Sequence, residues 1–436
     1  MATKPNKVTL RTYDVGFGDC FLLSFHYGAI AKHILIDFGS TRNPSGKAGT
    51  GNYLERIANQ IKVDAGNKLT AVVATHRHKD HISGFTMRGN QGPGAIIRAL
   101  KPEIVIQPWT EDPDAEPDAT IPIQALKGIK GRTGLHVRNL KDMNRYATYV
   151  QAAAKRLRGS HLQAARDQLD FLGDDNSLAN RDAVTNLQTM GNPKRKPRYV
   201  HAGAKSGLEP LLPGVKVHVL GPPTLEQEPR IATQTDTQAD EFWHLRTGFW
   251  AKRATLLKHT SQLTKPLFLL DRVPWDARWY RYYAQKEQAT SLLSIVRSLD
   301  EAMNNTSVIL LFEVGDTLLL FPGDAQWENW RYALSDPKVQ KLLTRVNVYK
   351  VGHHGSLNAT PKSLWKGFDK KGGANKANRL LALLSTKDNV HGGKHGEPTE
   401  VPRTTLVDAL KKNSTLVDTR VAQATDLRLT REIDLS

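Results

Sequence analysis

THRHKDH, from Thr75 to His81, follows directly after the apolar run LTAVVA at 69–74. The length and the β-branched content of that run predict a buried strand. The loop after it contains three imidazoles and one carboxylate, at positions 76, 78, 80 and 81. These groups are good ligands for zinc and similar cations, and two such pairs on a tight loop suit two metal ions that share one water. A polar loop with incidental histidines is the alternative interpretation.

The composition indicates a globular chain with a strong positive charge. Its 436 residues include 61 Lys and Arg against 43 Asp and Glu, which gives a net charge of +18. Such a charge attracts polyanions, and nucleic acid is the commonest polyanion of the cytoplasm. We therefore expect nucleic acid, DNA first, as the partner. A basic surface without a particular partner is the alternative.

Cations also gather locally. Basic clusters occur in AKRLR at 154–158 and in NPKRKPR at 192–198, and WDARWYRYYAQK at 275–286 alternates aromatic residues with cations. The last stretch has the groups that stack on bases and neutralise phosphates. The half-buried face of a helix explains the same pattern, and we favour that interpretation.

Several features predict a cytoplasmic protein that does not insert into a membrane. No run approaches the roughly 18 apolar residues of a membrane helix. The N-terminus MATKPNKVTL lacks the apolar segment of a secretory signal. The one cysteine, Cys20, excludes an intramolecular disulfide and is expected to be a small buried hydrophobe in its strand.

The pattern HxHxDH after a buried strand resembles the signature of the metallo-β-lactamase-fold hydrolases. Four further stretches resemble the same family in the same order: YDVGFGDCFLLSF (Tyr13–Phe25), HILIDFGS (His33–Ser40), DTLLLFPGDA (Asp316–Ala325) and VNVYKVGHHGS (Val346–Ser356). The motifs VGxGD, LFxGD and KVxHHGS are most similar to one branch of this family. That branch contains the hydrolase domain of the bacterial DNA-uptake competence channel and its soluble relatives.

The resemblance implies an α/β fold, a four-layer αββα metallo-β-lactamase sandwich that forms a single domain over residues 1–436. Two mainly helical insertions are expected at 110–200 and 224–303, where helical spacing replaces the family motifs. Gly, Asn and Pro predict an exposed connection at 173–197. Local patterns also predict helices at 53–60, 95–100, 327–334 (or on to 343) and 403–412, strands at 103–109, 214–223 and 379–385, a hairpin within 307–324 and a C-terminal strand that completes one sheet.

The resemblance also implies a dinuclear centre. His76 and His78 are expected to bind the first metal ion, Asp80 and His81 to help bind the second, and Asp324 to bridge the two. The cofactors would be two divalent ions, zinc or manganese.

One ligand of the family is absent from this sequence. The family usually has a histidine just before the hairpin, but this chain has NNTS there, as the DNA-uptake branch has Asn. Asn305 is the expected substitute. Because an amide oxygen is a harder and weaker donor than imidazole, the first site would be labile or would prefer manganese.

Other polar residues near the motifs receive expected roles from the resemblance. His354 is the expected last ligand of the second ion, and His353 would orient a phosphate or protonate a leaving oxygen; the reverse assignment stays open. Lys350 would either contact a phosphate or lie on the solvent side of its strand. In the last loop, His395 fits the position of a proton donor better than His391. Asp37 is expected to support the loop from Thr75 to His81, called the ligand loop below.

These expectations favour a metal-dependent hydrolase, a phosphodiesterase or nuclease that acts on nucleic acid through a metal-bridged hydroxide. Its catalytic residues would be Asp80, His353, His395 and Lys350. One alternative is a metallohydrolase of a small phosphodiester or another small molecule, and a second is a non-catalytic nucleic-acid-binding module. A regulatory partner protein is conceivable, and nothing in the sequence indicates the oligomeric state.

Overall fold

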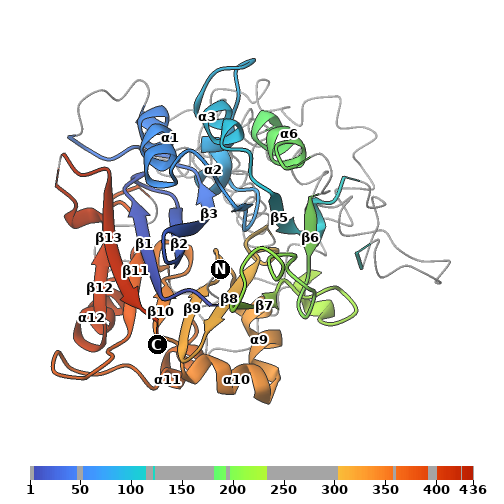
Figure 1. Ribbon diagram of the computed structural model, residues 1–436. Helices are drawn as coiled ribbons and strands as arrows, with labels where there is room; N and C mark the ends of the chain where they lie inside the picture. The colour runs from blue at the N-terminus through green and yellow to red at the C-terminus, as the bar shows by residue number, and fades with distance from the viewer. Residues whose placement is uncertain are drawn as a thin grey trace, which may run out of the picture.

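Two mixed β-sheets pack face to face, and helices flank them on the outside (Figure 1). The computed structural model describes residues 4–46, 53–113, 121–122, 181–192, 197–232, 303–356, 360–390, 400–423 and 425–435. Within these residues the fold is α/β, which confirms the predicted class.

The first sheet contains seven strands in the order β13-β1-β2-β3-β4-β5-β6. Its strands are β1 (Lys7–Tyr13), β2 (Cys20–Tyr27), β3 (Ile30–Phe38), β4 (Ala71–Val73), β5 (Ile104–Pro108), β6 (Arg198–Val200) and β13 (Arg428–Asp434). The pairs from β13 to β3 are antiparallel, and those from β3 to β6 are parallel. The C-terminal strand therefore completes this sheet, as predicted.

The second sheet contains six strands in the order β12-β11-β10-β9-β8-β7. Its strands are β7 (Lys216–Gly221), β8 (Ile309–Val314), β9 (Thr317–Phe321), β10 (Val348–Lys350), β11 (Leu381–Leu384) and β12 (Thr415–Asp418). The strands β7, β8 and β9 pair antiparallel, and β9 to β12 run parallel. The hairpin of β8 and β9 turns at Gly315 and Asp316, as predicted.

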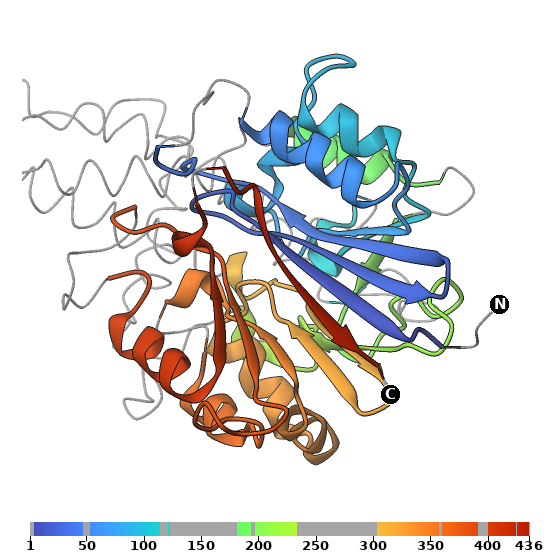
Figure 2. The ribbon, with the colours of Figure 1, turned by 60° about the vertical axis from the view of Figure 1, so that its left-hand side comes forward.

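The helices lie on the outer faces of the two sheets, which Figure 2 shows from the side. On the first sheet these are α1 (Tyr53–Asp64), α3 (Pro93–Ala99) and α6 (Arg181–Thr189), with the short α2 (Lys79–Ile82) in the ligand loop. On the second they are α9 (Trp327–Ser335), α10 (Pro337–Thr344), α11 (Lys362–Gly367) and α12 (Thr404–Asn413). None of the helices in the described ranges has the length and apolarity needed to cross a membrane.

The alternation of side chains along the strands explains this layering. In β2, Phe21, Leu23 and Phe25 point into the core between the sheets, while Cys20 and Leu22 pack with the helices outside. Phe21 meets Phe321 of the opposite sheet edge to face, with ring centroids 5.8 Å apart. A strand that is apolar on both faces is what a sheet covered on both sides requires.

One local prediction is wrong, and another is confirmed in the shorter of its two forms. The expected exposed connection at 173–197 contains α6, in which Ala183 and Leu187 are buried against the first sheet. Ala183 and Leu187 lie one turn apart on the same face of the helix. Their burial stabilises the helix in spite of the polar residues around them. The helix predicted at 327–334 is confirmed as α9, and its optional continuation to 343 is not, because Asp336 caps a new helix that begins at Pro337.

The two predicted insertions fall mostly outside the described residues. Of the range 110–200, α6 and β6 belong to the core layers, and 114–120, 123–180 and 193–196 are not described. Of the range 224–303, residues 233–302 are not described. The aromatic and basic stretch at 275–286, the cluster at 154–158 and most of that at 192–198 lie there too. The insertion boundaries therefore stay predictions.

Gly39 permits the close approach of β3 to the ligand loop, and this contact generates a prediction. A Cβ at Gly39 would lie 2.4 Å from the backbone carbon of Asp80, whereas one at Gly367 would meet nothing within 4 Å. We expect Gly39→Ala to lower the free energy of unfolding by about 1–3 kcal/mol, because the backbone must move. Gly367→Ala should leave it unchanged or raise it slightly. Urea unfolding measures both, and equal stability of the two variants would contradict the described contact.

His33 on β3 provides a pH prediction. Burial, reinforced by the neighbouring Arg11, lowers the pKa of His33 to about 4, below its usual 6.5. Between these two pH values the unfolded chain binds a proton that the folded chain rejects, so stability should fall as the pH drops from 6.5 to 4. His33→Gln should lose less stability over this range than wild type. Parallel pH profiles of the two melting temperatures would contradict this assignment.

Candidate metal centre

The candidate ligands follow the ends of parallel strands at one edge of the sandwich. The loop of His76, His78, Asp80 and His81 follows β4, Asp324 follows β9, and His354 follows β10. Because β3 and β4 are parallel, and β9 and β10 are parallel, the carboxyl ends lie side by side within each sheet. The contacts of His81 with Asp324 and of Asp80 with His354 bring the two sets together at one edge. Clefts at this edge are the usual location of sites in α/β folds.

Four side chains form the centre of the cluster: Asp80, His81, Asp324 and His354. One ligand atom from each lies within 4.8 Å of the others, and all four residues are buried. His81 Nε2 is 3.0 Å from Asp324 Oδ2, and His354 Nε2 is 2.7 Å from Asp80 Oδ2. Residues far apart in the chain thus contribute their ligand atoms to one small volume. These groups could hold a metal ion.

Hydrogen bonds behind the two imidazoles fix their orientation. His81 Nδ1 lies 2.8 Å from Asp37 Oδ2, and His354 Nδ1 lies 3.0 Å from the carbonyl of Ser385. If each Nδ1–H donates to its acceptor, each Nε2 keeps its lone pair for the cluster. Histidines that bind metals usually have such a partner on their other nitrogen. Asp37 therefore has the supporting position that we expected, and it also accepts from Thr75 N and Thr75 Oγ1, both at 2.7 Å.

His76 and His78 form a pair beside the cluster. His76 Nε2 lies 2.9 Å from His78 Nδ1, and the ring centroids of His76 and His81 are 4.1 Å apart. Two nitrogens on one tetrahedral zinc ion would be separated by about 3.3 Å. The pair is therefore close to the spacing of two ligands that share an ion. As ligands of a first ion, these two residues stay predictions.

The backbone is strained where it presents these groups. Asp37, His353 and His354 have positive φ values of 54°, 42° and 51°, and Gly355 follows with φ of 82°. For residues with a Cβ this left-handed conformation costs about 1–2 kcal/mol each. Such strain is concentrated at functional sites. The turn is stabilised by His353 N, which donates to Asp324 Oδ1 at 3.0 Å.

The buried charges shift the pKa values of the imidazoles in opposite directions. Burial opposes protonation of His354, but the carboxylates of Asp324, Asp19 and Asp80 outweigh it and raise its pKa to about 9. The pKa of His81 is raised well above its usual value for the same reason. Burial and the neighbouring imidazoles lower the pKa of His76 instead. The centre of the cluster therefore attracts positive charge.

The donor set fits a divalent cation. Four buried carboxylates, of Asp19, Asp37, Asp80 and Asp324, face one buried ammonium, that of Lys350, which leaves three negative charges in excess when the imidazoles are neutral. Asp80 Oδ1 is buried and accepts no hydrogen bond from any described residue. A mixed set of imidazole nitrogens and carboxylate oxygens suits zinc or manganese.

The other predicted site residues have different surroundings. Lys350 is 2% exposed and contacts Asp324, so it faces the cluster and not the solvent. His353 is half-buried, with its ring centroid 6.2 Å from that of His354. Asn305 is buried; its Nδ2 donates to Glu328 at 2.8 Å, and its Oδ1 accepts no hydrogen bond from a described residue. His395, like His391, lies outside the described residues.

Asp19 is a residue of the site that our sequence interpretation did not single out. It ends the VGFGD motif and is fully buried, and its side chain contacts Lys350. Its backbone N donates to Asp80 O at 2.9 Å, so the loop before β2 holds the ligand loop directly. The motif was the available signal, but we assigned it only to a strand.

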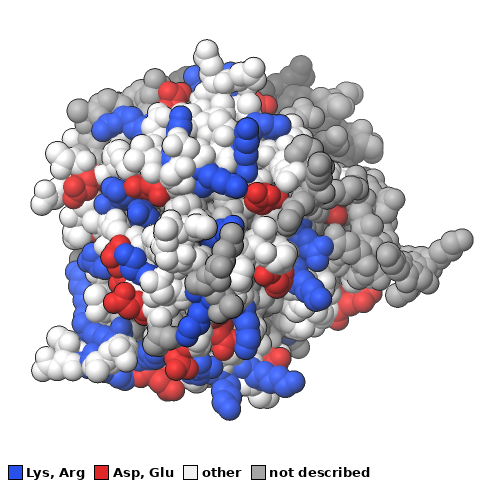
Figure 3. Space-filling view, viewed as in Figure 1, with Lys and Arg blue, Asp and Glu red and all other residues white. Residues whose placement is uncertain are grey.

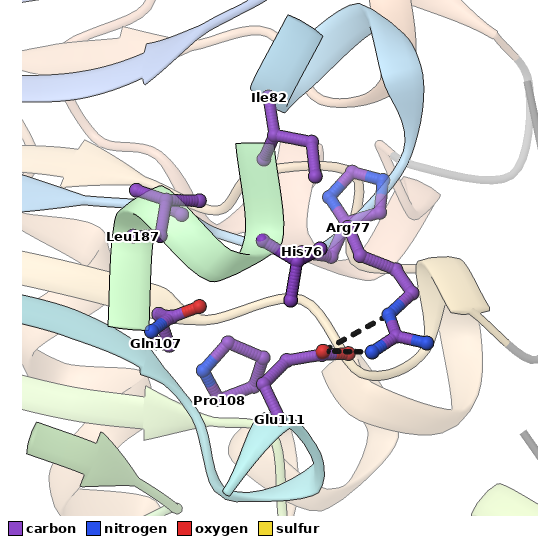
Figure 4. A pocket seen from close by; sticks show the side chains of 9 residues that line it. His76, Arg77, Ile82, Gln107, Pro108, Glu111 and Leu187 are labelled. Atoms are coloured by element: carbon purple, nitrogen blue, oxygen red, sulfur yellow. Dashed lines mark hydrogen bonds and ion pairs between the residues drawn. The ribbon is translucent and has the colours of Figure 1, made fainter. Parts of the chain in front are cut away.

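Arg77 anchors the ligand loop through an ion pair with Glu111. Its Nε donates to Glu111 Oε2 at 2.9 Å, and Figure 4 shows this ion pair beside a depression next to the loop. The depression is lined by Ala74, His76, Ile82, Gln107, Pro108, Val184 and Leu187 together with the ion pair. Arg77 thus connects the ligand loop to the turn after β5, another contact that the sequence motif did not indicate.

Neither a comparison with protein-family models nor a search of curated proteins finds a match to this chain.

The strained turn generates a prediction at His353. Asn adopts positive φ more readily than other residues with a Cβ. Because both substitutions remove the imidazole, we expect His353→Asn to be more stable than His353→Ala by about 0.5–1 kcal/mol. At Lys366, inside α11, the same pair should show the opposite order, since Ala is the better helix former. Chemical denaturation measures all four variants. If His353→Ala and His353→Asn had the same free energy of unfolding, this would contradict the left-handed turn.

Proposed function

We propose that this protein is a metal-dependent hydrolase that cleaves phosphodiester bonds in nucleic acid, DNA first. The observation that carries the proposal is the buried cluster of Asp80, His81, Asp324 and His354, with the His76 and His78 pair beside it. Structural zinc sites close with four ligands. A group of about six donors at strand ends is better suited to two ions and a reacting water.

The layer order supports the proposed family. Helices outside two face-to-face sheets agree with the αββα sandwich of the metallo-β-lactamase fold, which the motifs resemble. The fold alone does not select a substrate, because one scaffold serves many chemistries. The choice of substrate therefore depends on the site and on charge.

In the reaction, the side chains of this protein would bind the cations, orient the substrate and transfer a proton. When bound, divalent cations supply the Lewis acidity that activates water and neutralises charge on a phosphoryl group. His81 and His354, through Nε2, and Asp80 and Asp324, through carboxylate oxygens, would hold one cation, and His76 and His78 would help to hold a second. His353, half-buried beside Asp324, and His395 are the candidates for protonating the departing oxygen.

Charge supports a polyanionic substrate. The net charge is +18, and Lys and Arg are spread over the face shown in Figure 3 with acidic residues between them. Each phosphate contact releases counterions, so binding of nucleic acid should weaken steeply with salt. Hydrolysis of a small phosphodiester would depend on salt far less.

Asp80→Asn tests the proposal because it keeps the size of the side chain and removes its charge. With labelled single- and double-stranded DNA and added manganese, we expect wild type to cleave. Asp80→Asn should be slower by about 100-fold or more. Raising the salt concentration should suppress cleavage by wild type.

Asp316→Asn is the matched control. The Asp316 side chain is 95% exposed, so the same substitution there should leave cleavage unchanged. Cleavage by Asp80→Asn at the rate of wild type would contradict the catalytic assignment. A wild-type protein that cleaves small phosphodiesters but no nucleic acid would favour the small-molecule alternative.

A further inference from the structure

Lys350 is a buried cation inside the candidate metal centre. Its Nζ donates to Gly323 O at 3.0 Å and to Asp324 Oδ1 at 3.1 Å, and it forms an ion pair with Asp19. An ammonium group has three donors, and these three acceptors use all of them. No donor remains for a substrate phosphate. The position of Lys350 therefore indicates a role towards Asp324.

Asp19 completes this arrangement from the other sheet. It lies in the loop between β1 and β2, whereas Lys350 ends β10, so the ion pair joins the two sheets behind the ligands. Its oxygens are also 3.6 Å from His354 Nδ1 and 3.7 Å from His81 Nδ1. Both contacts are on the side of the ring opposite the nitrogen that faces the cluster.

The two oxygens of Asp324 are consequently not equivalent. Oδ1 accepts two hydrogen bonds, from Lys350 Nζ at 3.1 Å and from His353 N at 3.0 Å. Oδ2 is 3.0 Å from His81 Nε2 and 3.5 Å from His354 Nε2. Rotation of the carboxylate would give up both donors to Oδ1. The bonds to Oδ1 therefore keep Oδ2 directed at the other ligand atoms.

We propose that Asp19 and Lys350 are positioning residues, a buried ion pair that locks Asp324 with Oδ2 directed at the cation. This inference rests on the proposed function in one respect, since it requires that the cluster binds a divalent cation. Asp19 shares the ammonium with Asp324. Without Asp19, the Lys350 ammonium would pair with the Asp324 carboxylate alone. It would then compete with the metal cation for that carboxylate.

Metal affinity of the folded protein tests the proposal without an activity assay. Manganese and zinc binding would be measured by titration calorimetry for wild type, Asp19→Asn and the double variant Asp19→Asn/Lys350→Met. The double variant keeps the net charge of wild type, so it separates geometry from charge. We expect both variants to bind at least about tenfold more weakly, as is usual when a ligand loses its supporting partner.

Asp64→Asn is the control for a merely structural effect. Asp64 is also buried and paired, with Arg428 at 2.7 Å and with the hydroxyl of Tyr13 at 2.8 Å, but it lies at the end of α1 on the outer face. Its substitution should lower the melting temperature and leave metal affinity unchanged. Affinity equal to that of wild type in the double variant would overturn the proposal, because the lock would then be dispensable.

The outcomes separate this inference from the proposed function. Weaker metal binding in both variants, combined with a wild type that binds metal but hydrolyses no phosphodiester, would support the positioning role and refute the activity. Hydrolysis by wild type, with unchanged affinity in the double variant, would support the activity and refute the positioning role. A wild type that binds neither metal would refute both.

Discussion

The structure depends on an excess of buried negative charge at one edge of the sandwich. Asp19, Asp37, Asp80 and Asp324 are almost completely removed from solvent, and among the described residues Lys350 supplies the one buried ammonium beside them. A carboxylate in such surroundings is costly unless it is paired or bound to a metal. The carboxylates raise the pKa values of His81 and His354, so protons on these two imidazoles would supply part of the compensation. A divalent cation would supply it in their place.

The rest of the fold holds these charges together. The first sheet contributes Asp19, Asp37 and the ligand loop, and the second contributes Asp324, Lys350 and His354. Neither sheet has the cluster alone, so the cluster exists only when the two sheets are packed on each other. The strained turn at 353–355 and the close approach at Gly39 lower stability locally, and both lie where ligand atoms are presented. The large shared core offsets this cost.

Sequence predicted the parts of this site that depend on local spacing. The three histidines and Asp80 share one short loop, so their proximity follows from the strand before them. Asp324 and His354 were reached through family motifs, because nothing in local spacing brings residues 80 and 324 together. Asp19 and the pair of Arg77 with Glu111 were missed, since a single charged residue indicates no partner until the fold is known.

For the fold as well, sequence predicted the elements with local signals and not those that depend on tertiary contacts. Strands with β-branched residues and the hairpin at Gly315 were predicted, since their signals are local. The helix α6 was missed, because its few apolar positions matter only against the first sheet. Local spacing left the end of α9 open between 334 and 343, and the Asp-Pro start of α10 fixes it.

Anomalous diffraction from crystals soaked in zinc or manganese would show directly whether this cluster binds a cation. We expect a peak between Asp80, His81, Asp324 and His354, about 2.0–2.3 Å from their ligand atoms. A peak elsewhere, or none at saturating metal, would contradict this expectation.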